Sequence, residues 1–390
     1  MTIAPSAAPV ALATVTTGEE FEALAGEWDG LVRAMPRPSP FMLHAWLAEW
    51  WAHYGDGAEL AVHVARRDSR LVGALPLVVR RRPGLRVATF MGGRLSVLPD
   101  LLLAPGEDES TAEALAGHLA AGGFDVADLH GLPEHSRMAA ALGDRLQLIQ
   151  RIEAPVIDLS AGWDAVYRSK TNSKKRNLHK RRRRQLGELG TVTTTVARRL
   201  DELEPALEEA FHLHDLRWEG RPDGSGFATE TGRRFHRAAL RRLEAIDVAR
   251  IVTLRVDGRA IAFHYWFALE GGMYVHRLAF DPEVGRLSPG LVNTLDAIES
   301  ASEEGLTRVE FLGGGERYKL ELADGFAPLY HGYGVASGLR GRAYASAHLG
   351  AIQARRRLKR SERLHRFYFE GLAPARRLLS RRSPRGRGMR

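Results

Sequence analysis

The residues of this 390-residue chain that could do chemistry lie late in the sequence. Gly285-Arg286-Leu287-Ser288-Pro289-Gly290 follows an apolar, strand-like run and precedes a helix-like run. Glycines at such a junction leave backbone N–H groups unshielded, and a helix N-terminus adds partial positive charge, so the junction suits an anion such as pyrophosphate. Ordinary turns use the same residue types. An anion site and a plain turn are therefore both open for this stretch.

Several familiar catalytic motifs are absent. The chain has no G-x-x-x-x-G-K-[ST], no G-x-S-x-G and no H-E-x-x-H, and Gly313-Gly314-Gly315 lacks the spacing of a phosphate loop. His212 and His214 are two apart in a helix-like run, so they face different directions and cannot share a metal. Cysteine is absent, which excludes disulfides, thiol catalysis and thiolate metal sites. ATP-driven, serine-hydrolase and metallohydrolase functions are disfavoured, and we expect no metal.

The elements that position these residues occur twice along the chain. "VHVARRDSRLVGALPL", from Val62, and "VTLRVDGRAIAFHYWF", from Val252, both read as a strand, a tight polar turn and a second strand. Residues of the two hairpins match at one constant difference in residue number, the difference between Asp68 and Asp257. We call this difference the offset.

Elements outside the hairpins also match between the two halves. "FDVADLHG" (124–131) matches "TRVEFLGG" (307–314), and aromatic-rich helices are expected over 44–55 and 207–220. We therefore predict a tandem repeat of one α/β fold with a mixed sheet.

Composition suggests the segments that join and follow the two copies. The predicted domains are a flexible tail (1–15), a first, degenerate copy (16–160), a basic linker helix (161–190), a second copy with the donor site (191–338) and a basic tail (339–390). We expect one helix with a thin apolar stripe in the linker. The tail is predicted to form one or two basic amphipathic helices and to end in a disordered segment.

The charge of the chain is distributed unevenly. The net charge is +9, but residues 161–190 carry +8 and residues 340–390 carry +14, which leaves −13 for the rest. A polyanionic partner explains such segments, and so do solvated helix faces. No apolar run approaches the roughly 20 residues of a membrane span, and the first residues have no basic region typical of a secretory signal. We expect a cytoplasmic location, or one peripheral to the inner face of the membrane.

Several runs resemble a known family. Strand, strand, glycine-rich loop, helix, strand is the core order of the GNAT acyltransferase fold. "PFMLHAWLAEWW", "VGALPLVVRRR", "KKRNLHKRRRRQLGELG" and above all "RLSPGLVNTLDAIESASEEGLTRVEFLGGGERYK" resemble the BioF2-like, or CelD-like, acetyltransferases, which are related to the Fem aminoacyl-tRNA ligases. The resemblance implies two tandem GNAT-like domains and transfer of an acyl group from acetyl-CoA or another acyl-CoA to an amine.

The resemblance also implies a set of site residues. The donor would be held by Leu278 and by five residues of the loop: Gly285, Arg286, Leu287, Ser288 and Gly290. Tyr318 and Lys319 stand where the family has its YK pair. The chain departs from the usual loop, Q/R-x-x-G-x-G/A, because Pro289 falls at the first glycine and removes an amide donor.

Acyl transfer to an amine also needs a base. Glu310 alternates with Val309 and Phe311 and could face the pocket, and His276 lies in an apolar strand near the presumed acyl channel. A salt-bridged carboxylate and a core histidine are the structural alternatives. The corresponding structural alternatives are a core histidine for His264, a surface-loop residue for Arg286 and an exposed lysine for Lys319.

Two other functions stay open. The basic segments favour Fem-like aminoacyl transfer from tRNA, since Lys and Arg contacts to phosphate give affinity without reading sequence. The basic tail, with Phe367 and Phe369, favours a catalytically degenerate protein bound to RNA or to an anionic membrane. The acceptor is expected to be a small-molecule or cell-envelope-precursor amine.

Overall fold

The computed structural model describes residues 9–107, 109–218, 226–314, 316–336 and 338–360. The chain divides into two compact units at Val335/Ala336, close to the predicted start of the basic tail. The second unit is described only as α12 (Gly338–Arg360), a helix where one was expected. The final segment that we predict to be disordered lies outside the described residues. No helix in the described ranges is long and apolar enough to cross a bilayer.

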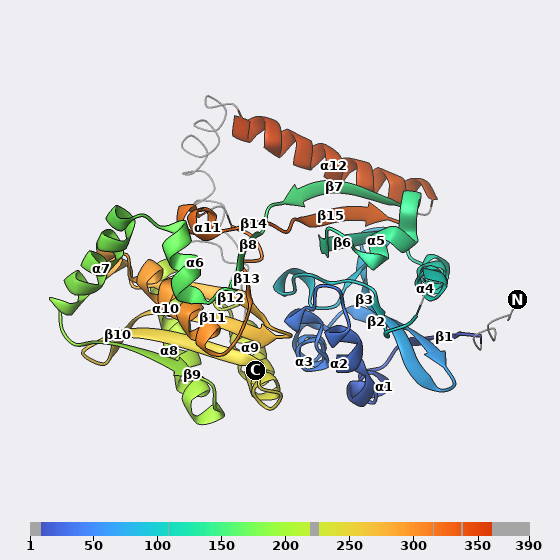
Figure 1. Ribbon diagram of the computed structural model, residues 1–390. Coiled ribbons are helices and arrows are strands. Elements are labelled where there is room, and N and C mark those ends of the chain that lie inside the picture. The colour runs from blue at the N-terminus through green and yellow to red at the C-terminus, as the bar shows by residue number, and fades with distance from the viewer. Residues whose placement is uncertain (1–8, 108, 219–225, 315, 337, 361–390) are drawn as a thin grey trace, which may run out of the picture. The chain divides into compact units, whose positions relative to one another are not determined.

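Two mixed sheets form the first unit (Figure 1). The first has the order β1-β2-β3-β4-β6-β15-β7, with β5 paired to β3. Its strands are β1 (Ala11–Val15), β2 (Ala58–Arg67), β3 (Arg70–Arg82), β4 (Leu85–Phe90), β5 (Leu102–Leu103), β6 (Val126–Pro133), β7 (Leu146–Ile152) and β15 (Leu329–Gly334). Most of β3 is buried, as its continuous apolar sequence requires, because helices cover both faces of the sheet.

The second sheet has the order β14-β8-β13-β12-β11-β10-β9. Its strands are β8 (Pro155–Asp158), β9 (Val192–Ala197), β10 (Ala249–Val256), β11 (Arg259–Leu269), β12 (Gly272–Phe280), β13 (Arg308–Glu310) and β14 (Gly325–Phe326). Antiparallel hairpins join β10 to β11 and β11 to β12, whereas β12 and β13 are parallel and are connected by a helix.

Helices pack on both sheets. The helices of the first half are α1 (Gly18–Glu22), α2 (Ala25–Arg33), α3 (His44–Tyr54), α4 (Glu109–Ala121) and α5 (Arg137–Leu142). Those that follow are α6 (Trp163–Lys170), α7 (Ser173–Gly187), α8 (Leu200–Trp218), α9 (Glu230–Glu244), α10 (Pro289–Glu303) and α11 (Arg317–Leu322). Short 3₁₀ turns cover Pro40–Met42, Gly93–Leu95, Gly143–Arg145 and Pro282–Leu287.

The predicted tandem repeat is confirmed in detail. The β2–β3 turn has positive φ at Asp68 and Ser69, and the β10–β11 turn has positive φ at the matching residues, Asp257 and Gly258. Each hairpin also carries a bulge, between Ala65 and Arg66 in β2 and between residues 254 and 255 in β10, at the same offset as the turns. The third strand of each copy, β4 or β12, pairs in parallel with the strand that follows a helix, β6 or β13.

One predicted equivalence is wrong. The helix that matches α3 is α9 rather than the run at 207–220, which belongs to α8. α9 directly precedes β10 as α3 precedes β2, at the offset that relates the two hairpins. The aromatic content of α8 suggested the other match. Composition alone does not show which of the two helices before β10 is the equivalent of α3.

The two copies exchange strands. β15, from the end of the second copy, pairs antiparallel with β6, and β8, from the end of the first, pairs antiparallel with β13. Because β6 and β13 are equivalent, each sheet is completed by the other copy. The division of the sequence into 16–160 and 191–338 therefore does not follow the sheets. Local sequence cannot assign a strand to one of two equivalent edges.

Two predicted segments also differ from the structure. Residues Ala11–Val15, expected in the flexible tail, form β1 and pair with β2. The linker forms two helices, α6 and α7, rather than one. The helical conformation is interrupted at Thr171 and Asn172. The Asn172 side chain accepts a hydrogen bond from the Lys175 amide and so starts α7 afresh. The apolar stripe of α7 is thin, with Leu186 as its buried residue.

Candidate functional site

A cleft opens where β12 and β13 diverge. Their parallel pairing covers only Gly272–Tyr274 against Arg308–Glu310, although β12 continues to Phe280. Opposite β11, the register shifts so that His276 is an extra residue in β12. Such a bulge bends its strand and increases the local twist. Among the described strands, none pairs with the β13-facing edge of β12 after Tyr274.

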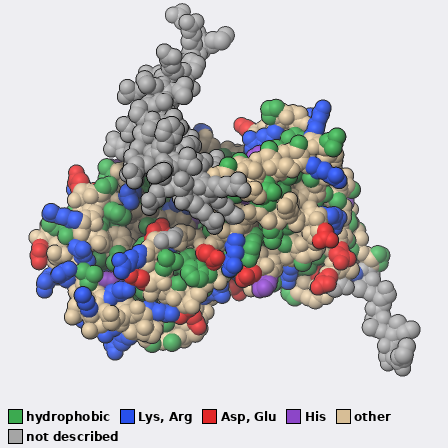
Figure 2. All heavy atoms as spheres, turned by 90° about the horizontal axis from the view of Figure 1, so that it is seen from above, with side chains coloured by type: hydrophobic (Ala, Val, Ile, Leu, Met, Phe, Trp, Pro, Cys, Tyr) green, Lys and Arg blue, Asp and Glu red, His purple; other side chains and the backbone are tan. Residues whose placement is uncertain are grey.

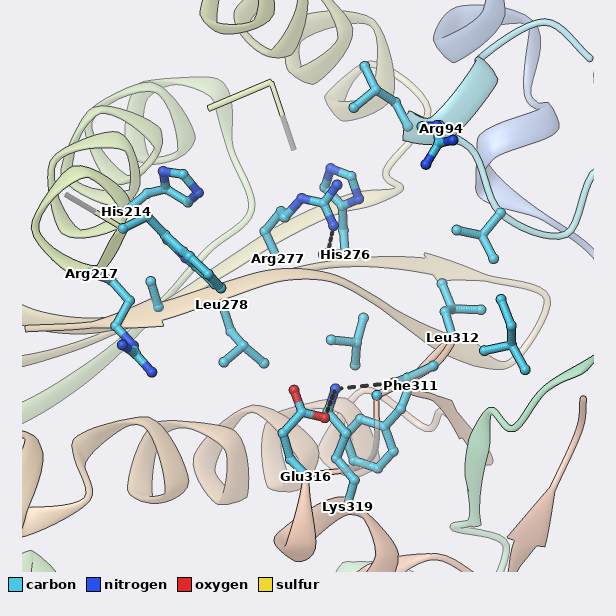
Figure 3. Close-up of a pocket in the computed structure, with 18 of the residues that line it drawn as sticks. Arg94, His214, Arg217, His276, Arg277, Leu278, Phe311, Leu312, Glu316 and Lys319 are labelled. Carbon is cyan, nitrogen blue, oxygen red and sulfur yellow. Dashed lines mark hydrogen bonds and ion pairs between the residues drawn. The ribbon is translucent and has the colours of Figure 1, made fainter. Parts of the chain in front are cut away.

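The space beside this edge is a cleft of about 710 Å³, which is the size of a small-molecule site. α8, α11 and loops of the first copy complete its walls (Figure 3). The residues that line it are Phe41, Arg94, Leu95, Val97, Ile152, His214, Arg217, Trp218, Val275, His276, Arg277, Leu278, Ala279, Phe280, Phe311, Leu312, Gly313, Gly314, Glu316, Tyr318 and Lys319.

Tyr318 and Lys319 lie together in the cleft, on the first turn of α11. The Lys319 ammonium donates to the Gly313 carbonyl at 3.2 Å and forms an ion pair with Glu316 at 3.0 Å. Gly314 has φ 94°, a backbone conformation that favours glycine, and a Cβ there would lie 2.6 Å from Lys319 Nζ. Burial raises the pKa of Tyr318, so its hydroxyl keeps its proton at neutral pH. Lys319 therefore places a charge at the cleft, and the Tyr318 hydroxyl, which is itself enclosed by protein, stays protonated beside it.

His276 projects from the bulge of β12. Its ring packs among aromatic side chains, with centroids 5.5 Å from Phe41, 5.3 Å from Trp46 and 5.2 Å from Phe267. Burial holds the pKa of His276 well below its usual value, and Nε2 has no hydrogen-bond partner in the described structure. The neutral ring can accept a hydrogen bond from a ligand. His264, on β11, is wholly buried and does not line the cleft.

Two arginines that the sequence did not single out lie at separate ends of the cleft (Figure 3). Arg217, on α8, lies over the Phe280 ring at 4.9 Å, and Arg94 comes from the first copy. Within the described ranges, neither forms an ion pair. With Arg277 and Lys319, they make the lining strongly cationic, since Glu316 is the single carboxylate among the described residues that line the cleft. The cleft is therefore suited to an anionic ligand, and both copies contribute to it.

The glycine-rich loop lies beside the cleft. Of the residues assigned to donor binding, Leu278 lines the cleft itself. A Cβ would lie 3.2 Å from the Phe280 ring at Gly285 and 2.8 Å from it at Gly290, so both glycines allow this cleft residue to pack against the loop. The backbone of Ser288 has a left-handed conformation, with φ 58° and ψ 48°. Ser288 is the N-cap of α10, and its side chain makes no capping hydrogen bond.

The other loop residues face away from the cleft. Arg286 and Leu287 line a separate hollow of about 370 Å³ next to α7, whose Arg182 donates to the Arg286 carbonyl at 2.9 Å. The structure thus separates Arg286 and Leu287 from Leu278, which the sequence placed in one group.

Glu310 lies outside the cleft. Its carboxylate is fully buried and accepts hydrogen bonds from Arg37 at 3.0 and 2.6 Å and from Arg308 at 2.7 Å. The expected alternation along β13 is correct, but the face opposite the apolar one meets arginine from the first copy. Glu310 is therefore the salt-bridged structural carboxylate that the sequence left open as the alternative to a catalytic base.

The equivalent opening in the first copy is filled by protein. The loop after β4 is buried at Met91, Leu98 and Leu101. A Cβ at Gly131 on β6 would lie within 3.8 Å of residues 97–99, so this loop follows β6 closely. The buried Asp100 carboxylate accepts hydrogen bonds from the Ser136 hydroxyl and from the Met138 amide at the start of α5. The described part of the first copy therefore retains the fold and closes the opening.

This combination of three antiparallel strands, a connecting helix, a parallel strand and a cleft at their divergence defines a GNAT-type acyltransferase fold. Residues 173–320, less than half of the chain, match the family described as the acetyltransferase (GNAT) domain. None of the curated proteins matches the chain.

Solved structures show the same fold over most of the chain. The C-terminal domain of a putative lysylphosphatidylglycerol synthetase from Agrobacterium fabrum has a TM-score of 0.53 at 14% identity, over 85% of this chain and 97% of that one. FemX has a TM-score of 0.54 at 12% identity, over 83% and 96%. A conserved protein of unknown function from Bacteroides thetaiotaomicron has a TM-score of 0.53 at 13% identity, over 83% and 100%. The fold thus comprises two tandem GNAT-like domains.

Proposed function

We propose that the protein is an N-acyltransferase that moves an acyl group, acetyl in the simplest case, from acyl-CoA to an amine in the cleft beside β12. The observation that carries the proposal is the divergence of β12 from β13 at the His276 bulge, beside a cationic lining. An unpaired strand edge can bind the amide groups of an extended ligand, and the pantetheine part of CoA is such a ligand.

The residues present suit acyl-CoA. Arg217 supplies a cation at the end of the cleft where Phe280 meets the glycine-rich loop. In that loop, Pro289 has no N–H, and Leu291 and Val292 already donate to the Ser288 carbonyl. The Gly290 amide is then the loop group for phosphate in the cleft, whereas Arg286, assigned the same task from the sequence, lines the separate hollow beside α7. Acyl-CoA supplies a thioester carbon, which the neutral amine attacks; the C–S bond breaks, and the proton lost by the nitrogen passes to the departing thiolate, so that CoA leaves as the thiol.

The residues of the cleft divide the remaining tasks. His276 Nε2 accepts a hydrogen bond from the acceptor amine and orients its lone pair, and backbone N–H groups on the free edge of β12 stabilise the developing oxyanion. Lys319, held by Gly313 and Glu316, adds positive charge, and the protonated Tyr318 hydroxyl donates to the leaving sulfur. Glu310 has no part, because both of its oxygens are taken by arginines.

The resemblance to BioF2-like, or CelD-like, acetyltransferases points to the same reaction. The acceptor is then a small-molecule or cell-envelope-precursor amine, and its access past Arg94 favours one that also carries an anionic group. A cytoplasmic location, where acyl-CoA is available, goes with this proposal.

A second function is favoured by the surface of α7. Lys174, Lys180 and Arg181 are exposed and form no ion pair with any described residue. Basic side chains gather on the side of the molecule where α7 lies (Figure 2). A hollow of about 760 Å³ beside them is also lined by Arg317, from the helix that carries Tyr318. Such a surface suits a polyanion, so aminoacyl-tRNA is the alternative donor.

One experiment separates the two donors. The purified protein is incubated with acetyl-CoA, and CoA binding and slow thioester hydrolysis are measured; aminoacylated tRNA is tested in parallel. We expect binding and hydrolysis of acetyl-CoA, with both weakened by Arg217→Ala and unchanged by the triple variant Lys174→Ala, Lys180→Ala, Arg181→Ala. Binding of charged tRNA alone, lost in the triple variant, would establish the alternative. Binding of neither donor would favour a degenerate protein.

A further inference from the structure

A histidine–carboxylate cluster lies outside the cleft, where the strand exchange joins the two copies. Asp128 and His130 are on β6, and His331 is on β15. The His331 Nε2 lies 2.8 Å from Asp128 Oδ1, and His130 Nε2 lies 3.0 Å from the same oxygen. One donor atom of each residue lies within 4.8 Å of the others. The three side chains therefore converge on one point.

The backbone is shaped to bring these side chains together. Asp128 and His130 are two residues apart on one strand, and His331 is directly opposite His130 in the pairing of β6 with β15. Between Tyr330 and His331 the register shifts, so Gly131 is an extra residue in β6, with φ 78°. On the other side, a shift between His331 and Gly332 makes residue 149 of β7 an extra residue. Bulges re-aim side chains, and His331 has one on each neighbouring strand.

We propose that Asp128, His130 and His331 bind a divalent transition metal, with zinc as the best match. Two imidazoles and one carboxylate are a donor set that zinc accepts, and a fourth position is left for water. Ligand atoms about 2.0–2.2 Å from zinc in tetrahedral geometry lie somewhat over 3 Å apart, so the cluster must open by a few tenths of an ångström. The His130 and His331 rings are stacked, with centroids 3.3 Å apart and planes at 24°, so the exposed His130 ring must also turn to aim its nitrogen at the ion. This assignment differs from the expectation of no metal drawn from the sequence.

Accessibility supports an exchangeable site. The His130 side chain is 40% exposed, whereas those of Asp128 and His331 are 15% and 5% exposed. An ion can therefore enter beside His130 and reach the two more buried ligands. Because the ligands come from strands of both copies, the metal would tie the C-terminal strand of the second copy to the first sheet.

Metal binding is tested on the full chain without a polyhistidine tag, after EDTA treatment and removal of EDTA. We expect one equivalent of Zn²⁺ to remain bound after gel filtration, and Co²⁺ to produce visible d–d absorption. The chain has no cysteine, so these bands report nitrogen and oxygen ligands. Zn²⁺ should also raise the melting temperature, since it binds the folded state, and EDTA should reverse the rise.

His130→Gln is the main variant because its exposed side chain can be replaced with little effect on packing. We expect it and Asp128→Asn to weaken Zn²⁺ binding by about 100-fold or more and to abolish the Co²⁺ bands. His135→Gln is the matched control, an exposed histidine in the turn that follows β6. Melting in EDTA shows whether each variant folds. Absence of stoichiometric Zn²⁺ in the wild type, or equal uptake by wild type and His130→Gln, would overturn the proposal and leave a hydrogen-bonded His–Asp–His group.

Discussion

Trp46 and Phe235 occupy equivalent positions in the two copies, at the offset that relates the two hairpins, and their rings contact each other edge to face at 4.8 Å. Equivalent residues that touch place the local symmetry axis of the repeat between α3 and α9. Both rings are fully buried, in a hydrophobic core cluster that includes Leu75 of the first sheet and Phe263 of the second. The two copies therefore share this core cluster.

A shared core predicts cooperative unfolding. Phe235→Ala should lower the free energy of unfolding by about 3–5 kcal/mol, the usual cost of removing a buried aromatic ring. Urea unfolding, followed by circular dichroism and by tryptophan fluorescence, should show a single transition at a lower midpoint. Phe326→Ala is the control, since Phe326 is 50% exposed. Two separate transitions in the wild type would show that the copies fold independently.

The ion pair between Arg37 and Glu310 joins the copies a second time. Glu310→Ala should destabilise the protein by about 3–5 kcal/mol, because it leaves Arg37 without its carboxylate partner, and Arg37→Ala should cost less, because Glu310 keeps its pairing with Arg308. The double variant should cost less than the sum of the two single changes. Acyl transfer by the folded variants should be unchanged. A loss of turnover in a fully folded Glu310→Gln variant would instead return Glu310 to the catalytic group.

Lys319 should distinguish catalysis from binding. If its charge stabilises the oxyanion, Lys319→Ala lowers kcat by about 10²–10³-fold with little change in KM, the effect of losing one oxyanion donor. If it holds phosphate or a polar acceptor, KM rises and kcat stays. Lys180→Ala, an exposed lysine on α7, is the control. Wild-type kinetics in Lys319→Ala would remove it from the site.

Arg217 and Arg286 test where the donor's phosphates bind. Each change to alanine should weaken CoA binding by about 1.5–3 kcal/mol if the side chain makes a charge-assisted hydrogen bond. Isothermal titration calorimetry at two salt concentrations measures this, and Arg70→Ala, in the first hairpin, is the control. Unchanged affinity in Arg286→Ala with loss in Arg217→Ala would assign the phosphates to the cleft alone. Gly290→Val is a poor test, because the added side chain would displace Phe280.

His264 should make stability depend on pH. Burial and, to a lesser extent, the charge of Lys319 lower the pKa of His264 to about 3, against about 6.5 in the unfolded chain. Between these values the unfolded chain binds a proton that the folded protein does not. The contribution of His264 to the free energy of unfolding is therefore complete above pH 6.5 and is lost as the pH falls towards 3.

The variant His264→Leu removes this contribution. Between pH 7 and pH 5 the wild type should lose up to about 2 kcal/mol more than the variant, at about 1.36 kcal/mol per pH unit below 6.5. Urea unfolding at several pH values measures the difference, with His135→Gln as the control. Parallel pH curves for wild type and His264→Leu would contradict the assignment.

The sequence determined much of this protein by itself. The two hairpins were visible because tight turns need residues that tolerate positive φ, and Asp68-Ser69 and Asp257-Gly258 supply them. Their constant offset revealed the tandem fold. Tyr318, Lys319, His276 and Leu278 were placed together from motif and strand position, and all four line the cleft.

Only the tertiary structure decided the rest. The bulge at His276, the exchange of β8 and β15, and the pairing of Glu310 with Arg37 all depend on which distant strands and loops become neighbours. Arg94 enters the cleft from the other copy, and no local pattern marks it. Each exchanged strand could pair with the edge of β6 or with the equivalent edge of β13. Packing over the whole core determines which of the two edges it pairs with. Sequence periodicity records which face of a strand is apolar, but it does not record the partner of the opposite face.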